Sequence, residues 1–233
     1  MKLLISLLFT CVFLFAVNPK ILPLKGVEVN HIYSTNKTET ILIQREEEPI
    51  CSDFGITPEN FQAEDLASIN VPKECKKTFF VTKGTIQPLH LTRGVTTVAE
   101  LEVLDFIENK SSKNPKKYIL VDSRKSSWFD FGTIPSSVNI PYDEFDYDED
   151  FEEEYKRAYK LLGVKIIDKN KYDFTNAKTV IFFCNGSWCA QSPRAIKNLI
   201  KKGYPREKIM WYRGGIASWA GVSLTLTKNI EAK

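Results

Sequence analysis

A short apolar stretch that ends in a cysteine loop constrains the fold of this chain more than any other feature. The run Val180–Cys184 is rich in β-branched and aromatic residues, which predicts a buried strand. Asn185 and Gly186 then turn the chain, and apolar residues with helical spacing follow Ser192. Serine is a favoured N-cap and Pro193 suits the first helical position, so we expect the helix to begin there. Alternating strands and helices predict an α/β domain with a mostly parallel central sheet flanked by helices.

A loop between a strand and a helix directs backbone N–H groups and the positive end of the helix dipole toward its interior. A cysteine in such a place is biased toward the thiolate, which is the reactive form. Cys184 lies at the strand end, and Cys189 lies shortly before the expected helix cap. Either cysteine is therefore a candidate nucleophile, and the two together are a candidate redox pair.

Several segments in a fixed order resemble the rhodanese homology domain. Residues Tyr118–Arg124 look like the strand of that family that ends in Asp-x-Arg, and Gly132–Pro141 is similar to its Gly-His-Ile-Pro-Gly-Ala-x-Asn-Ile-Pro segment. The cysteine loop and the later run Arg213–Trp219 follow in the family order. The resemblance implies a rhodanese-like domain at residues 95–227. In the family, the residues that match Asp122 and Arg124 hold loops around the carboxyl end of the sheet.

The loop departs from the family pattern in ways that bear on the reaction. Cys184 lies farther from Ser192 than the family cysteine lies from the serine that opens its helix, so the loop is longer. No Lys or Arg lies between these two residues, where family members often carry a basic residue. Cys189 is an additional cysteine inside the loop, and Thr133 replaces the histidine of the Gly-His-Ile-Pro motif. These differences affect the expected reaction more than the expected fold.

The resemblance implies a sulfurtransferase that carries sulfane sulfur as a persulfide on a loop cysteine. Such an enzyme takes the sulfur from a small sulfur-containing anion and passes it to a thiol acceptor, without a diffusible cofactor. Cys184 is the expected nucleophile because it matches the family cysteine, and Cys189 is the second catalytic candidate because it can attack the persulfide and leave a disulfide. The expected substrate-binding residues are Asn185, Gly186, Ser187, Trp188, Gln191, Ser192 and Arg194.

Other functions fit the same residues. A periplasmic thiol–disulfide oxidoreductase would use Cys184 and Cys189 as its redox pair. A non-catalytic rhodanese-like binding module would keep a structural disulfide in the loop and contact a protein partner through its N-terminal region. His31 and His90 are the only histidines and lie outside the family motifs, so we expect neither a Cys-His dyad nor a metal site. A net charge of +3 on 233 residues does not suggest nucleic acid as a partner.

The N-terminus has the composition of an export signal. Met1 and Lys2 provide a basic start, and an apolar run extends from Leu3 to Val17. This run is long for a signal peptide and short for a membrane-spanning helix. Residues 1–17 are therefore expected to be a signal peptide or a membrane anchor. The protein is then periplasmic or, if the segment stays uncleaved, anchored to the inner membrane.

Four cysteines remain beyond this leader, and an even number in an exported chain suggests disulfides. We expect Cys51 to pair with Cys75, which closes a loop of about 25 residues and stabilises the fold by roughly 3–4 kcal/mol on the chain-entropy estimate. Residues 25–91 are expected to form a small β-rich module. Its expected elements are strands at residues 27–33, 39–44 and 78–82 and a short helix at residues 58–66.

Two further patterns concern helices of the larger domain. Thr97 and Glu100 have the spacing of a capping box, which predicts a helix that runs through Ile107. In residues 143–154, nine of twelve residues are acidic. The apolar residues in and after this segment share one helical face, which predicts a solvated helix with acids near its N-terminus. The alternative is an acidic docking surface beside the cysteine loop. The residues of that face are Phe151, Tyr155, Ala158 and Leu162.

Overall fold

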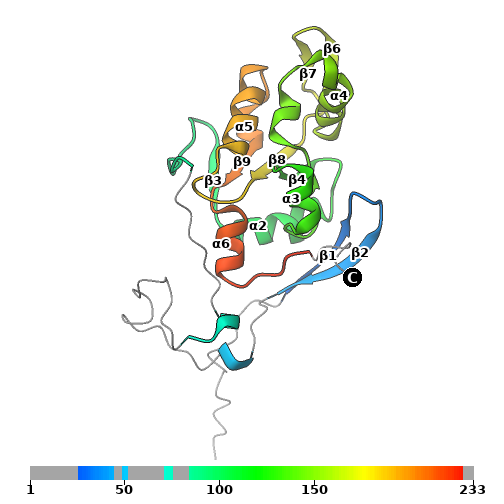
Figure 1. Ribbon diagram of the computed structural model, residues 1–233. Helices are drawn as coiled ribbons and strands as arrows, with labels where there is room; N and C mark the ends of the chain where they lie inside the picture. The colour runs from blue at the N-terminus through cyan, green and yellow to red at the C-terminus, as the bar shows by residue number, and fades with distance from the viewer. Residues whose placement is uncertain (1–25, 45–48, 52–70, 76–83, 228–233) are drawn as a thin grey trace, which may run out of the picture.

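A five-stranded parallel sheet forms the centre of the protein (Figure 1). The computed structural model describes residues 26–44, 49–51, 71–75 and 84–227. The strands lie in the order β3-β9-β8-β4-β5, and each neighbouring pair is parallel. They are β3 (Thr96–Val98), β4 (Tyr118–Asp122), β5 (Val138–Asn139), β8 (Thr179–Phe183) and β9 (Ile209–Tyr212). The predicted α/β domain with a mostly parallel sheet is confirmed.

Helices cover both faces of the sheet (Figure 1). The α-helices are α2 (Glu100–Phe106), α3 (Ser126–Phe131), α4 (Glu152–Leu161), α5 (Gln191–Lys201) and α6 (Gly215–Gly221). A π-helical turn, η3 (Ile107–Ser111), extends α2. The short 3₁₀ helices are η1 (Pro49–Cys51), η2 (Lys73–Cys75), η4 (Tyr142–Phe145), η5 (Glu149–Phe151) and η6 (Arg206–Lys208). A small hairpin of β6 (Lys165–Asp168) and β7 (Lys171–Asp173) follows α4.

Strand β8 contributes side chains to two hydrophobic cores. Val180 and Phe182 pack with residues of α4 and α5, whereas Ile181 and Phe183 pack with residues of α2 and α6. The two pairs separate in this way because successive side chains of a strand point to opposite faces of the sheet. All four are fully buried. A strand covered on both faces is apolar throughout, which is why this run is continuous in the sequence.

The N-terminal region adds an antiparallel hairpin to the second of these cores. Strand β1 (Val27–Ile32) pairs with β2 (Thr38–Ile43), which places two predicted strands within one residue of their expected ends. Val27, Val29 and Ile43 are buried in the same core as α2 and α6. The backbone of Gln44 also exchanges hydrogen bonds with Thr225 near the end of the described chain. The hairpin therefore packs directly on the sheet domain.

Other predictions for the N-terminal region lie outside the described residues. They are the leader at residues 1–17, the helix at residues 58–66 and the strand at residues 78–82. Cys51 and Cys75 are described, and they are joined in a disulfide with their Cα atoms 5.4 Å apart. In the described part of the chain, no helix is long and apolar enough to cross a membrane.

Both predicted helix caps are wrong. Helix α5 begins at Gln191, so Ser192 lies inside its first turn instead of at the N-cap. Thr97 belongs to β3, and its hydroxyl donates to the Leu89 carbonyl at 2.5 Å. Ala99 is the N-cap of α2, and its N–H donates to the side chain of Glu102 at 3.0 Å. Each hydroxyl bonds to a group from another part of the fold, and such a bond competes with local capping.

The acidic segment is not a single helix. Helix α4 begins only at Glu152, and the residues before it form η4 and η5. Tyr155 and Ala158 are buried as predicted, but Phe151 is 59% exposed because it precedes the helix. The first acids of the segment pair with basic residues of other elements. These pairs are Lys125–Asp143, Arg157–Glu144 and Arg194–Asp146.

Candidate functional site

Cys184 lies at the carboxyl end of β8, where the chain leaves the sheet. Its carbonyl accepts the Ile216 N–H at 3.0 Å, and the Asn185 carbonyl accepts the Ala217 N–H at 2.9 Å. These donors belong to the first turn of α6. Gly215 has a φ of 55°, and a Cβ at this position would lie 2.1 Å from the Cys184 carbonyl oxygen. Only glycine allows α6 to approach the start of the loop so closely.

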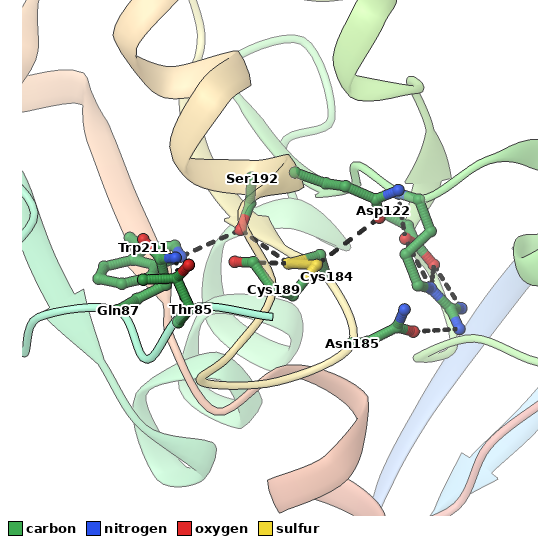
Figure 2. Close-up of a disulfide and its surroundings, with 10 residues drawn as sticks. Thr85, Gln87, Asp122, Cys184, Asn185, Cys189, Ser192 and Trp211 are labelled. Carbon is green, nitrogen blue, oxygen red and sulfur yellow. Dashed lines mark hydrogen bonds and ion pairs between the residues drawn. A yellow bond between two sulfur atoms is a disulfide. The ribbon is translucent and has the colours of Figure 1, made fainter. Parts of the chain in front are cut away.

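A tight turn returns the loop to Cys184. The Cys189 N–H donates to the Gly186 carbonyl at 2.9 Å. The Cα atoms of Cys184 and Cys189 are 6.4 Å apart, within the range of roughly 4.4–6.8 Å that a disulfide needs. The structure joins the two sulfurs in a disulfide beside the first turn of α5 (Figure 2). The sequence had left open whether the loop would bring the two cysteines together, and the fold does so.

Ser192 connects the loop to the neighbouring strand β9. Its hydroxyl donates to Cys184 Sγ at 3.3 Å and accepts the indole N–H of Trp211 at 3.1 Å (Figure 2). The sequence motifs did not identify this contact of Trp211. The contact depends on the strand order, because β8 and β9 are parallel neighbours and Phe182 lies opposite Trp211. A polar aromatic residue at that register position comes close to the carboxyl end of β8.

A buried ion pair holds the next loop along the sheet. The Arg124 guanidinium donates to Asp122 at 2.7 Å, and the two side chains are 4% and 0% exposed. Arg124 also donates to the Gly132 carbonyl at 2.7 Å and to Asn185 Oδ1 at 3.4 Å. Thr133, which replaces the family histidine, donates its hydroxyl proton to Asp122 at 2.7 Å. This pair therefore has the supporting role that the resemblance implied, and it reaches the cysteine loop through Asn185.

The segment just before β3 crosses the outside of the cysteine loop. The Gln87 N–H donates to the Ser187 carbonyl at 2.8 Å. Gly84 approaches Trp188 so closely that an added Cβ would lie 2.8 Å from the Trp188 carbonyl oxygen. Arg213 fixes the segment from the other side by donating to the carbonyls of Gln87 and Pro88. Sequence reasoning missed this contact because it placed residues 84–91 in the N-terminal module.

The other predicted binding residues lie at the start of α5. The Gln191 side-chain oxygen is 3.6 Å from Cys189 Sγ. The Arg194 side chain is 54% exposed, and its guanidinium pairs with Asp146 and lies over the ring of Tyr142. The hydrogen bond that Arg194 donates to the Asp146 carboxylate raises the pKa of Arg194. Arg194 thus has a carboxylate partner in this structure, whereas the loop itself carries no cation between Cys184 and Ser192.

Dipoles, instead of full charges, therefore dominate the electrostatics of the loop. Both cysteines are buried, with 2% of Cys184 and 8% of Cys189 exposed. The positive end of the α5 dipole and the Ser192 hydroxyl favour negative charge on sulfur. Among the described residues, no group of His, Cys, Asp and Glu side chains could hold a metal ion. The arrangement can support attack by a thiolate, formation of a persulfide and exchange of a disulfide.

Comparisons with known proteins identify the family of the chain. A family model described as Rhodanese-like domain matches residues 103–221, slightly more than half of the 233 residues. No curated protein matches the chain.

The solved structures that match the chain include three of low sequence identity. The BH2092 protein from Bacillus halodurans is 17% identical with a TM-score of 0.40, over 58% of this chain and 78% of that one. A thiosulfate sulfurtransferase from Pseudomonas aeruginosa is 16% identical with a TM-score of 0.38, over 59% of this chain but only 21% of that one. The As-Sb reductase from Leishmania major is 24% identical with a TM-score of 0.36, over 54% and 77% of the two chains.

Proposed function

The chain belongs to the rhodanese-like domain family, and from this we propose that it is a sulfurtransferase that carries sulfane sulfur on Cys184. The observation that carries the proposal is the position of Cys184 at the carboxyl end of β8, with the first turn of α5 beside its sulfur. A thiolate at this place is stabilised by the helix dipole and by the Ser192 hydroxyl. Residues 184–192 supply the site, and the substrate is a small sulfur-containing anion such as thiosulfate.

The transfer proceeds in two half-reactions. The Cys184 thiolate attacks the outer sulfur of thiosulfate, the sulfur–sulfur bond of the substrate breaks, and sulfite leaves with its electron pair. The product is a persulfide on Cys184. A thiophilic acceptor such as cyanide then removes the outer sulfur and restores the Cys184 thiolate. Loop dipoles stabilise the anionic sulfur in both steps, so the reaction uses groups of this chain alone.

Cys189 provides a second route by which the persulfide can react. The Sγ atoms of Cys184 and Cys189 are close enough to be bonded. Attack of the Cys189 thiolate on Cys184 Sγ expels hydrosulfide and forms the disulfide of this structure. The enzyme then needs a thiol reductant before its next cycle. The disulfide is on this account the oxidised resting form of the site.

A thiol–disulfide oxidoreductase is the second candidate, and the Cys184–Cys189 disulfide is the observation that favours it. In that function the pair exchanges electrons with other thiols and no persulfide forms. Transfer of sulfur from thiosulfate to cyanide separates the two candidates. The sulfurtransferase predicts transfer by the reduced wild-type protein, loss of transfer in Cys184→Ser and retained transfer in Cys189→Ser. Retained transfer in Cys184→Ser with loss in Cys189→Ser would assign the nucleophile to Cys189 instead.

We also propose that the protein is exported. The basic and apolar composition of residues 1–17 supports export, as does the pair of cysteines at positions 51 and 75 at disulfide distance, because reducing compartments rarely keep structural disulfides. Fractionation of cells that express the full chain tests this proposal. Recovery of the protein with a cytoplasmic marker would contradict it.

A further inference from the structure

A chain of hydrogen bonds makes the two loop sulfurs chemically different. Trp211 Nε1 donates to Ser192 Oγ at 3.1 Å, and Ser192 Oγ donates to Cys184 Sγ at 3.3 Å (Figure 2). The direction of this chain is fixed by the donor and acceptor inventory. An indole N–H can only donate, and a hydroxyl that accepts it keeps one proton of its own to donate onward.

Burial strengthens this hydrogen-bond chain. Ser192 is 0%, Trp211 1% and Cys184 2% exposed. Hydrogen bonds to an ionised acceptor are stronger than neutral ones, and a low local dielectric increases their effect. Negative charge on Cys184 Sγ is therefore stabilised by a donor that is already oriented. Each sulfur also lies near an oxygen that cannot donate a hydrogen bond, with Cys184 Sγ 3.5 Å from the Cys189 carbonyl and Cys189 Sγ 3.6 Å from the Gln191 side chain. The hydrogen bond from the Ser192 hydroxyl is therefore the contact that distinguishes Cys184.

We propose that Trp211 is a positioning residue that acts through Ser192 to make Cys184 the leaving sulfur of the loop disulfide, so that an incoming thiol attacks Cys189. This inference rests on the proposed function, because it describes how the oxidised site is reduced for another cycle. Cys189 is also the more exposed of the two sulfur-bearing residues. In thiol–disulfide exchange the more acidic thiol leaves faster, which selects Cys184.

The electrons balance in two exchange steps. A thiolate of the reductant attacks Cys189 Sγ, the bond between the two cysteines breaks, and its electron pair remains on Cys184 as a thiolate. This thiolate accepts the Ser192 hydrogen bond. A second thiolate then attacks the reductant sulfur in the mixed disulfide on Cys189. The products are the oxidised reductant and both loop cysteines in reduced form.

Trapping of the mixed disulfide in the full wild-type chain tests the assignment directly. The oxidised protein is treated briefly with glutathione and quenched with N-ethylmaleimide, which alkylates the released thiol and prevents its return. Peptide mapping should place glutathione on Cys189 and the maleimide on Cys184. Glutathione on Cys184, or equal labelling of both cysteines, would overturn the proposal. This measurement needs no variant, so a variant that fails to fold cannot remove the test.

Variants then test the two donors. Ser192→Ala and Trp211→Phe each remove a donor, and the glutathione reduction rate should fall by about tenfold or more for Ser192→Ala and by less for Trp211→Phe, because a hydrogen bond to a charged group is the stronger kind. In a Cys189→Ala background, the pH midpoint of Cys184 alkylation should move upward with Ser192→Ala and stay in place with Ser192→Thr. An unmoved midpoint in Ser192→Ala would overturn the proposed hydrogen-bond chain.

Trp219→Phe is the matched control for Trp211→Phe. Trp219 is equally buried, and its indole N–H donates to the Thr225 carbonyl at 2.7 Å, away from the loop. Its replacement should leave the reduction rate and the labelling pattern unchanged. Equal effects of the two tryptophan variants would attribute the loss to packing and overturn the positioning role.

The same measurements separate this inference from the proposed function. Absence of thiosulfate-to-cyanide transfer together with glutathione on Cys189 would remove the sulfurtransferase and leave the assignment of the leaving sulfur intact. Transfer activity together with glutathione on Cys184 would support the sulfurtransferase and overturn the assignment of Cys184 as the leaving sulfur.

Discussion

The Arg124 guanidinium donates to the Asp122 carboxylate at 2.7 Å in a site where both side chains are almost completely buried. Asp122 ends strand β4, and Arg124 is the second residue of the loop that follows. The same guanidinium binds the Gly132 carbonyl and reaches Asn185 in the cysteine loop. A charge buried in this way is costly without its partner, so the pair fixes both loops at the carboxyl end of the sheet.

Arg124→Met should lower the free energy of unfolding by about 3–5 kcal/mol, because it leaves the Asp122 carboxylate buried without a counter-ion. The measurement is urea unfolding at neutral pH. Lys125→Met is the matched control, since Lys125 pairs with Asp143 at a position where its side chain is 51% exposed. That change should cost less than about 1 kcal/mol. Similar losses in the two variants would contradict the distinction between buried and exposed pairs.

His31 should make stability depend on pH. Its side chain is buried between the rings of Tyr33 and Phe129, and neither ring nitrogen has a hydrogen-bond partner among the described residues. Burial lowers the pKa of His31 to about 4, whereas the unfolded chain takes up this proton near the ordinary value of 6.5. Between these values the unfolded state binds more protons, so stability is complete above the upper pKa and declines as the pH falls toward the lower one.

The test compares the free energy of unfolding of wild type and His31→Phe at about pH 7.5 and about pH 5. The wild type should lose about 2 kcal/mol more than the variant across this window. His90→Asn, which changes an exposed histidine, should keep the pH dependence of the wild type. An equal loss in wild type and His31→Phe would show that other groups cause the dependence.

Cys51→Ser with Cys75→Ser should reduce stability without changing sulfur transfer. The disulfide closes a loop with a sequence separation of 24 residues, for which the chain-entropy estimate is roughly 3–4 kcal/mol. The expected result is a lower urea midpoint and an unchanged transfer rate below the transition. A non-reducing peptide map of the wild type should show the two residues linked. Free thiols at both positions would remove this prediction and weaken the proposed export.

The central sheet was predictable because its signals are local. The uninterrupted apolar run of β8 indicates a strand buried on both faces, and the order of the motifs indicates the family. The caps were not predictable in the same way. Ser192 and Thr97 have the residue types of N-caps, but their hydroxyls bond to Cys184 and to the Leu89 carbonyl, which the chain brings near only on folding. Local preference gives way to tertiary hydrogen bonds in both cases.

The sequence indicates the two cysteines of the candidate site but not the residues that hold the cysteine loop in place. Cys184 and Cys189 follow from the loop, because a strand end and a helix start enclose them. The roles of Trp211, Gln87 and Arg213 depend on which strands are neighbours and on a segment that crosses the loop. Such contacts join residues far apart in the chain, and one sequence carries no local pattern for them.

Mass spectrometry of Cys189→Ser after treatment with thiosulfate tests the central claim most directly. This variant keeps Cys184 and lacks the thiol that would discharge its persulfide, so the loaded form should accumulate. We predict that the peptide with Cys184 gains the mass of one sulfur atom, and that cyanide or a thiol reductant removes it. A protein that is fully reduced, folded and exposed to thiosulfate, yet gains no sulfur on Cys184, would contradict the proposed sulfurtransferase.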